Sequence, residues 1–559
     1  MIVEPTRSSA IIASTLLVAL LAMTPTASGD ERLVDAIRAG DRESLVALLD
    51  RKEVDIDKGR ADGSTPLAWA AYMNDASAVD SLLHAGANVD KANAFHRVTP
   101  LSLACENGNS AIVEKLLAAG ADPNIAQRSG ETPLMTCADS GAVGGVMALL
   151  ASGADVNSRE LDDDQTALMW AAAGSRPAIV RLLADNGANV TARSRIVTKP
   201  EPYIVDMPLH QSIWGSNYPA TTRWQRVSGG FTALHFAAQS GDIESARILL
   251  EAGADIDAPL EEWGGPLNIA IASGHEEFAL FLVEQGADPN ATDAWGASAL
   301  HYALYKGLII INRWRPADDE HLGWERENMP RLVAALLERG ADPGARIKFG
   351  YPYQEHPFIA RSGDLPPQIS PVGATPLHLA AISGDVDTLR LLAPVSDPGA
   401  KTIGGGTVFL FAAGGGVERK ARKGENAVDV ARFALEIGGG SVTDFLIDTV
   451  PGGPRPGVKD RRTALHFATY HGWSELIEFL VAEGADIDAG DRYGMTPLMI
   501  ALGDPEGRYY RQVGEASYDL RMRRPGPTPG TGDNPEVAEL LLALGAQPFT
   551  GEYRDVSGL

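Results

Sequence analysis

One short phrase recurs along the chain and limits what the chain can fold into. The phrase typically reads Thr, then Pro or Ala, then Leu, followed by small and apolar residues. Its copies start at Thr65, Thr99, Thr132, Thr166, Thr232, Gly265, Ser298, Thr375, Thr407, Thr463 and Thr496, and many successive starts lie 33 or 34 residues apart. A fixed period of this length indicates stacked supersecondary units instead of a single globular core.

Each copy has the residues of a helix start, and most copies are followed by a second apolar run. Thr or Ser caps a helix N-terminus with its hydroxyl oxygen, and Pro fits the first helical turn. The second run ends in Gly-Ala-Asp or Gly-Ala-Asn, as in AIVEKLLAAGADPN, and Gly favours the left-handed conformation that ends a helix. The segment ERLVDAIRAGDRESLVALLDRKEVDID before Thr65 is an atypical further unit.

The phrase, its period and the trailing Gly-Ala-Asp together resemble the ankyrin repeat, from about Glu31 to Gln547. The resemblance implies an all-α fold: an α-solenoid of about twelve helix-turn-helix units with short β-hairpin fingers and several long loop insertions. Neighbouring units then build the core between them, because one unit cannot bury its apolar face alone.

A histidine in the phrase raises the question of catalysis, since GFTALHFAAQSGD places Thr232, His235, Ser240 and Asp242 close together. The same position holds other residue types in most copies, Ser102 and Met169 among them, whereas a general base must sit beside one specific nucleophile. We expect no catalytic residue there. The resemblance implies a structural role, as hydrogen-bonding groups between neighbouring units, for His235, His301, His378 and His466.

The first residues differ from the rest of the chain. The uncharged run AIIASTLLVALLAM covers residues 10–23 and is followed by small and polar residues. A helix of this length spans about 21 Å, less than the roughly 30 Å of a bilayer core. We predict a signal peptide over 1–29, and an exported protein of the periplasm or cell exterior with no membrane insertion after signal cleavage.

The remaining chain divides by how regularly the phrase returns. We predict an N-terminal capping unit over 30–64, the repeat array over 65–549 and a C-terminal tail over 550–559. Insertions interrupt the array near 196–230, 308–330, 345–373, 414–424, 448–462 and 503–534.

Composition narrows the class of partner. The chain is 45% hydrophobic and 22% charged, which is typical of a globular protein, and its formal net charge is −25. A negative surface repels phosphate backbones and anionic lipid, so we expect no nucleic-acid partner.

The only two cysteines, Cys105 and Cys137, occupy buried positions of the phrase where other units place Ala. Packed helices lie about 8–10 Å apart, whereas a disulfide needs Cα atoms within about 7 Å. We therefore expect two unbridged, inert thiols.

Exposed aromatic and arginine side chains are the candidates for protein binding, because such residues carry much of the energy of protein interfaces. Positions on the first helices, on the finger tips and in the insertions hold Tyr72, Phe95, Arg97, Trp263, Trp295, Tyr305, Tyr470, Tyr493, Trp214, Trp224 and Trp314. The alternative for the tryptophans is that they pack between fingers or fold the insertions back onto the array.

These observations favour a non-enzymatic protein–protein interaction scaffold, a monomer that binds one protein partner along its concave face of fingers and first helices. One alternative is an enzyme, metal-dependent or otherwise, with its site in the insertions; another is an exported effector that acts on host proteins. The sequence has no HExxH, GxSxG, Walker loop or CxxC. His321 and His356 have acidic neighbours, but adjacent loop residues rarely converge on one ion, so we expect no metal site and no cofactor.

Overall fold

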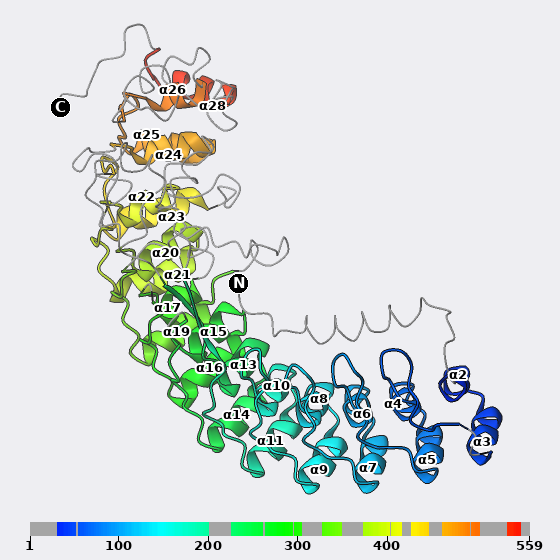
Figure 1. Ribbon diagram of the computed structural model, residues 1–559. Coiled ribbons are helices and arrows are strands. Elements are labelled where there is room, and N and C mark those ends of the chain that lie inside the picture. Colours follow the sequence, from blue (N-terminus) through cyan, green and yellow to red (C-terminus); the bar gives the residue numbers. More distant parts are fainter. Residues whose placement is uncertain are drawn as a thin grey trace. The chain divides into compact units, whose positions relative to one another are not determined.

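The computed structural model describes twelve ranges of the chain: residues 31–51, 54–200, 225–260, 263–294, 296–304, 327–348, 373–402, 404–415, 426–446, 461–491, 494–502 and 534–548 (Figure 1). Within these ranges the α-helices form twelve consecutive pairs, and one two-stranded sheet accompanies them. The prediction of an all-α solenoid of helix-turn-helix units is confirmed.

The helices of the first seven pairs are α2 (Arg32–Ala39), α3 (Arg42–Asp50), α4 (Pro66–Tyr72), α5 (Ala76–His84), α6 (Pro100–Glu106), α7 (Ser110–Ala118), α8 (Pro133–Ser140), α9 (Val143–Ala151), α10 (Ala167–Ala173), α11 (Pro177–Asp185), α13 (Ala233–Ser240), α14 (Ile243–Glu251), α15 (Pro266–Ala272) and α16 (Glu276–Gln285). The strands β1 (Ile196–Pro200) and β2 (Gln225–Gly229) lie between α11 and α13.

The helices of the last five pairs are α17 (Ala299–Ala303), α19 (Pro330–Glu338), α20 (Pro376–Ser383), α21 (Val386–Leu392), α22 (Val408–Ala412), α23 (Ala427–Glu436), α24 (Ala464–His471), α25 (Ser474–Ala482), α26 (Pro497–Leu502) and α28 (Pro535–Ala543). A short 3-10 helix, η2 (Ala393–Val395), follows α21.

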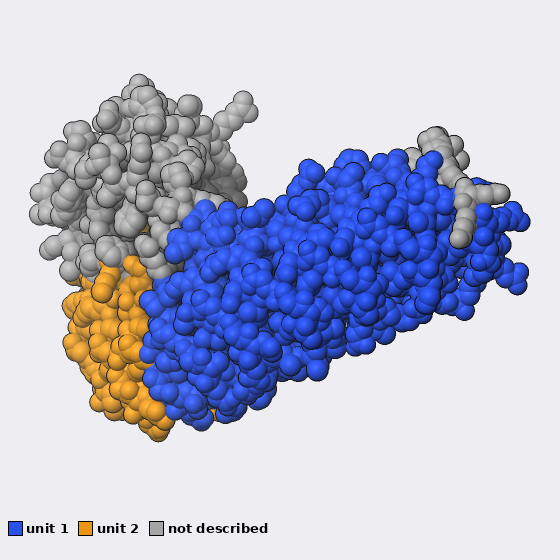
Figure 2. Space-filling model, turned by 60° about the horizontal axis from the view of Figure 1, so that its bottom comes forward, with its two compact units in different colours: residues 1–199, 226–287 blue, residues 200–225, 288–559 orange. Residues whose placement is uncertain are grey.

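The chain divides into two compact units, residues 1–199 with 226–287 and residues 200–225 with 288–559 (Figure 2). In the first unit, α4, α6, α8 and α10 lie in one row and α5, α7, α9 and α11 in a second row (Figure 1). In the second unit, α20 packs on α22 and α24 packs on α26 in the same manner. Within each unit, most first helices thus contact both their own partner and the first helix of the next pair.

The first helices start where the phrase predicts them. The Thr65 hydroxyl oxygen accepts a hydrogen bond from the Ala68 backbone N–H at 3.1 Å, and Thr99 caps α6 in the same way. Pro66 occupies the first turn of α4, where its missing N–H has no helical partner. At the end of the second helix of a pair, Gly120 has φ +92°, a conformation that costs any other residue a steric penalty.

The core lies between neighbouring pairs. Where Leu follows Pro or Ala in the phrase it is almost completely buried, as Leu67, Leu134 and Leu234 show, and Phe409 is equally buried at this position of its unit. Small residues beside it, such as Ala70 and Ala237, are also fully buried. They allow the first helices of neighbouring pairs to approach closely.

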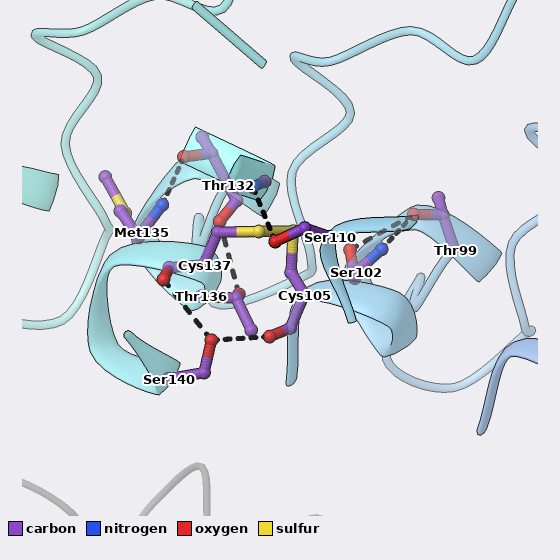
Figure 3. Close-up of a disulfide and its surroundings, with 10 residues drawn as sticks. Thr99, Ser102, Cys105, Ser110, Thr132, Met135, Thr136, Cys137 and Ser140 are labelled. Atoms are coloured by element: carbon purple, nitrogen blue, oxygen red, sulfur yellow. Dashed lines mark hydrogen bonds between the residues drawn. A yellow bond between two sulfur atoms is a disulfide. The ribbon is translucent and has the colours of Figure 1, made fainter. Parts of the chain in front are cut away.

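This close approach corrects the prediction for the cysteines. Cys105 on α6 and Cys137 on α8 form a disulfide with a Cα–Cα distance of 4.4 Å (Figure 3). The expectation of two unbridged thiols is therefore wrong. It treated the 8–10 Å between helix axes as the distance between Cα atoms, but each facing Cα lies about 2.3 Å off its axis, which leaves about 3.5–5.5 Å between them.

The insertions fall largely outside the described residues. At the ends of the first insertion, however, β1 pairs with β2 where the sequence indicated only a loop. Next to the strands, the Ser194 backbone N–H donates to the Phe231 carbonyl oxygen at 2.8 Å. The strands therefore lengthen the finger hairpin that precedes α13.

Candidate functional site

The fingers of the first unit form a continuous ladder of backbone hydrogen bonds. The N–H groups of Ala94, Arg128, Leu161 and Arg195 each donate to a carbonyl oxygen of the preceding finger, at Asp62, His96, Ser129 and Asp163 respectively. The distances between donor and acceptor are 2.9, 2.9, 2.7 and 2.6 Å. Each finger tip is thereby held in register with its neighbours.

A buried carboxylate supports the finger between α9 and α10. The Glu160 side chain is 5% exposed and accepts hydrogen bonds from the backbone N–H groups of Asp162, Asp163 and Gln165. A carboxylate that accepts several N–H bonds fixes the turn around it. Asp293 serves the finger before α17 similarly, with one oxygen bonded to the Ala297 N–H.

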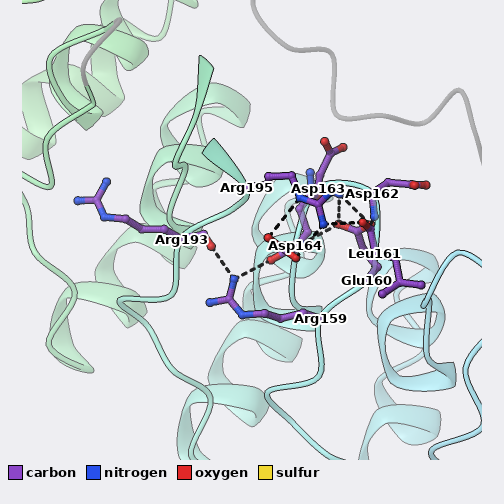
Figure 4. A network of polar contacts seen from close by, with 9 residues as sticks. Arg159, Glu160, Leu161, Asp162, Asp163, Asp164, Arg193 and Arg195 are labelled. Carbon is purple, nitrogen blue, oxygen red and sulfur yellow. Dashed lines mark hydrogen bonds and ion pairs between the residues drawn. The ribbon is translucent and has the colours of Figure 1, made fainter. Parts of the chain in front are cut away.

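Arginines connect each finger to the next one. In Figure 4, one guanidinium nitrogen of Arg159 donates to the carbonyl oxygens of Asp164 and Arg193, at 3.0 and 2.7 Å. Arg193 repeats the arrangement one unit later, with Gly230 and Pro259. Arg346 does so in the second unit. All three arginines lie four residues after the Asp or Asn of the Gly-Ala-Asp/Asn segment, and this fixed spacing is a sequence signal from which they could have been found.

We predict that Arg193→Ala lowers the free energy of unfolding of the first unit by about 1–2 kcal/mol, because Arg193 is half-buried and both its carbonyl partners lose a charged donor. Urea denaturation followed by circular dichroism measures the change. Arg128→Ala is the matched control, since Arg128 is exposed and its bond to the Ala94 carbonyl oxygen is 3.5 Å long. Equal losses in the two variants would contradict the prediction.

Just after the second helices, the Asn residues two positions beyond the Gly-Ala-Asp/Asn segments link neighbouring units. The Asn157 side chain accepts from the Asn189 N–H at 2.8 Å and donates to the Gly187 carbonyl oxygen at 3.1 Å. Asn124 makes the same two contacts with Asp155 and Gly153. These residues of the repeat are therefore structural.

The four histidines of the phrase act as helix caps. His235 is completely buried, and its Nδ1 accepts the Thr232 backbone N–H at 3.0 Å. Its Nε2 must then carry the proton, which it donates to the Ala258 carbonyl oxygen of the next finger at 3.0 Å. The same capping arrangement occurs at His301, His378 and His466.

Burial keeps the rings of His235, His301 and His378 neutral. Loss of hydration lowers the pKa of His235 to about 3 and those of His301 and His378 to about 4. A ring with such a pKa, bonded on Nδ1 and surrounded by protein, is a poor general base near neutral pH.

The predicted binding residues differ in how the structure places them. Phe95 is 60% exposed on the finger before α6, and Arg97 is exposed beside it. Tyr72 is half-buried against Trp69, with ring centroids 5.8 Å apart, and Tyr470 is half-buried beside His471. The remaining candidates Trp295, Tyr305, Tyr493, Trp214, Trp224 and Trp314 lie outside the described residues.

The expectation that Trp263 is an exposed finger residue is wrong. Its side chain is 7% exposed and, with Phe231 and Ile269, lines a cavity of about 10 Å³. The Leu260 N–H donates to the Gly264 carbonyl oxygen at 2.7 Å, which closes a very short finger and folds the tryptophan back onto α15. The ring is thus buried, as the alternative of a packing role expected, but it packs between its finger and α15 instead of between two fingers.

Sequence reasoning did not identify two residues that matter for the candidate site, the exposed Leu161 and the carboxyl group of Glu131. Leu161, in the acidic run LDDDQ, is 61% exposed on the finger before α10. Glu131 lies directly before Thr132, the cap of α8. Burial and, to a smaller extent, the nearby carboxylates Glu160, Asp162, Glu106 and Asp139 together raise the pKa of Glu131 to about 7.

Within the described ranges, no three His, Cys, Asp or Glu side chains come together as a metal site would require. The same ranges contain no helix with the length and apolarity of a membrane span. His321 and His356 lie outside them.

Comparison with known proteins identifies the repeats. The chain matches ankyrin repeats (3 copies) over residues 33–127, 101–194 and 432–508, ankyrin repeats (many copies) over 234–283 and 270–309, and the ankyrin repeat over 372–403. Together these matches span more than half of the chain.

Similar curated proteins share only part of their length with this chain. It is 34% identical over 128 residues to Zygote-specific protein 3 of Chlamydomonas reinhardtii, covering 22% of this chain and 34% of that protein. It is 38% identical over 105 residues to Palmitoyltransferase AKR1 of Kluyveromyces lactis, covering 18% of this chain and 14% of that protein. The chain thus spans about a third or less of these relatives.

Among solved structures, the human ASB11 ankyrin repeat domain is similar, with 22% sequence identity and a TM-score of 0.36. The similarity covers 50% of this chain and 99% of that domain. From its recurring phrase, its paired helices and the matches along its sequence, this chain belongs to the ankyrin-repeat family.

Proposed function

We propose that the chain is a non-enzymatic scaffold that holds a protein partner on the fingers and first helices of its first unit. The observation that carries the proposal is the exposure of large apolar side chains on fingers that are fixed in place, with Phe95 at 60% and Leu161 at 61%. Ankyrin repeats support a protein–protein interaction role. A rigid surface also loses little conformational entropy when a partner binds.

The disulfide supports export to an oxidising compartment. Cys105 and Cys137 are the only cysteines of the chain and are bonded to each other. Disulfides persist in the periplasm and outside the cell but are rare in the cytosol. The signal peptide predicted over residues 1–29 would direct the chain to the same compartments. We therefore propose a periplasmic or extracellular protein.

Affinity capture tests the scaffold function, with the full chain as bait against the exported proteins of the source organism. We expect a stoichiometric protein partner whose capture falls about tenfold or more in the Phe95→Ala/Leu161→Ala variant, because truncating apolar anchors commonly costs more than about 1 kcal/mol each. The matched control is Val143→Ala/Met147→Ala, which truncates two side chains on α9 that are 38% and 55% exposed.

If the finger variant captures as much partner as the wild type, the partner binds at a surface other than Phe95 and Leu161. Loss of the partner only in the α9 control would contradict the proposed face. A partner recovered in chemically altered form would favour an enzyme instead.

A further inference from the structure

Large apolar side chains are exposed on several fingers of the first unit, and Leu161 among them has acidic neighbours. Phe95 lies on the finger before α6, and Leu161 lies on the finger before α10. Leu161 covers the intervening finger: a Cβ atom added to Gly130 would lie 2.8 Å from Leu161 Cγ. Glu131 is the next residue in the chain, so an apolar surface and a carboxyl group are adjacent.

Three carboxyl groups on this surface lack a cationic partner. They are Glu106 at the end of α6, Glu131 before α8 and Asp162 beside Leu161, and in the described part of the chain none of them forms an ion pair. We call the surface formed by Glu106, Glu131, Leu161 and Asp162 the acidic finger face.

Cations of the same fingers are engaged with protein oxygens. The Arg195 guanidinium bonds the Asp164 carboxylate and the Leu161 carbonyl oxygen, and its bonds to the carboxylate lower the pKa of Asp164 (Figure 4). Arg128 is directed to the Ala94 carbonyl oxygen. Arg97 remains exposed beside Phe95, so the negative charge is concentrated toward Glu131 and Asp162.

We propose that the acidic finger face binds a basic protein segment, in which Lys or Arg side chains flank an apolar anchor. The anchor contacts Leu161, and the cations meet Glu106, Glu131 and Asp162. This inference rests on the scaffold function proposed above and specifies the partner of the same surface. Opposite charges across an interface guide association and exclude acidic competitors, whereas the apolar contacts supply most of the affinity.

Binding of a cation on this face is coupled to the release of a proton from the Glu131 carboxyl group. The titratable groups that act on Glu131 are Glu160 and Asp162 of the next finger, Glu106 on α6 and Asp139 on α8, and all four raise its pKa. The free protein therefore holds this carboxyl group partly protonated near pH 7, and a bound Lys or Arg favours the carboxylate. The complex should release a proton and strengthen as the pH rises from 6 to 8, by up to about tenfold for one such group.

A random-peptide display library, panned against the full chain at low salt and pH 8, supplies the probe. A selected peptide without His is then titrated by calorimetry against three proteins: the wild type, Glu106→Gln/Glu131→Gln/Asp162→Asn, and the control Glu43→Gln/Asp185→Asn/Glu284→Gln. The control removes three exposed carboxylates from the second helices α3, α11 and α16.

We expect selected peptides rich in Lys or Arg around an apolar residue, with affinity at least tenfold weaker for the finger-face variant and unchanged for the control. Calorimetry in two buffers of different ionisation enthalpy should show proton release with the wild type and none with the finger-face variant. Peptides without basic residues, or basic peptides that bind all three proteins equally, overturn the inference but leave the scaffold function in place. If the library yields no peptide that binds, the inference is overturned. If the affinity capture also recovers no partner, the scaffold function is overturned as well.

Discussion

Removing the Cys105–Cys137 disulfide is expected to lower the free energy of unfolding of the first unit by about 3–4 kcal/mol. The bond joins residues separated by 32 positions, and closing a loop of that length removes about this much conformational free energy from the unfolded chain. It also links α6 to α8 directly, so the loss should be concentrated in the pairs α4 to α11.

The double variant Cys105→Ala/Cys137→Ala measures this contribution, because Ala is the residue that other units place in the same buried positions. Urea denaturation of the wild type and the variant should give midpoints that differ without a reductant. With a reductant present throughout unfolding, the wild-type midpoint should fall close to that of the variant, whose own midpoint should not move.

The oxidation state provides the check on this interpretation. Thiol titration of the unfolded wild type without reductant should find no free thiol, and the intact mass should be lower by two hydrogens than after reduction. Two titratable thiols in protein isolated from its native compartment would contradict the bond, and midpoints that do not respond to reductant would contradict its effect on stability.

The period of the phrase made the fold predictable, because most copies repeat the same helix-start and core residues. Thr65 caps a helix, Pro66 fits its first turn and Leu67 enters the core, and the same three steps recur in later units. Gly120 and its counterparts then end the second helices. When local preferences and the stacking of units agree at each copy, sequence alone specifies the architecture.

Helix spacing, once converted to a Cα–Cα distance, permits the disulfide but does not by itself decide whether the bond forms. Ala and Cys at the contact between α6 and α8 let the backbones approach to a Cα–Cα distance of 4.4 Å. Larger residues at the same positions would hold the helices further apart. The identities of both contacting residues, and not the average packing distance, determine whether a bond can form.

Part of the candidate site depends on contacts that no motif records. Arg193 recurs at a fixed position of the repeat, but its carbonyl partners at Gly230 and Pro259 are far along the chain. The high pKa of Glu131 comes first from its burial and then from carboxylates on two helices and a neighbouring finger. Trp263 has the residue type of a binding hot spot. It is nevertheless buried, because two backbone hydrogen bonds between Leu260 and Gly264 close its finger. Each outcome depends on which residues of different units meet.

Acidification from pH 7.5 to pH 5 is expected to weaken the units that contain a buried histidine by about 2 kcal/mol each. His235, His301 and His378 have folded-state pKa values of about 3 to 4, whereas the unfolded chain binds a proton near pH 6.5. Because the folded pKa is the lower one, this contribution to stability is fully present above pH 6.5. It is lost as the pH falls toward 4, since only the unfolded histidine then takes up a proton.

Hydrogen–deuterium exchange resolves this effect along the array. After correction for the intrinsic exchange rate, protection in α13, α17 and α20 should fall about thirtyfold between pH 7.5 and pH 5, the ratio that follows from 1.5 pH units below the unfolded pKa. Helices α4 and α6 serve as internal controls, because the histidine position there holds Ala68 and Ser102.

A substitution separates the histidine from the other groups that titrate in this range. Asn268 occupies the same position in α15, so His235→Asn keeps a polar side chain that the fold already accepts at that place. The variant is expected to be less stable than the wild type at pH 7.5, because the bond to the Ala258 carbonyl oxygen is lost. Its α13 should nevertheless show no thirtyfold fall on acidification, while α17 and α20 in the same protein still do. If α13 of the variant loses protection as steeply as the wild type, the acid sensitivity arises elsewhere and the burial of a neutral His235 does not account for it.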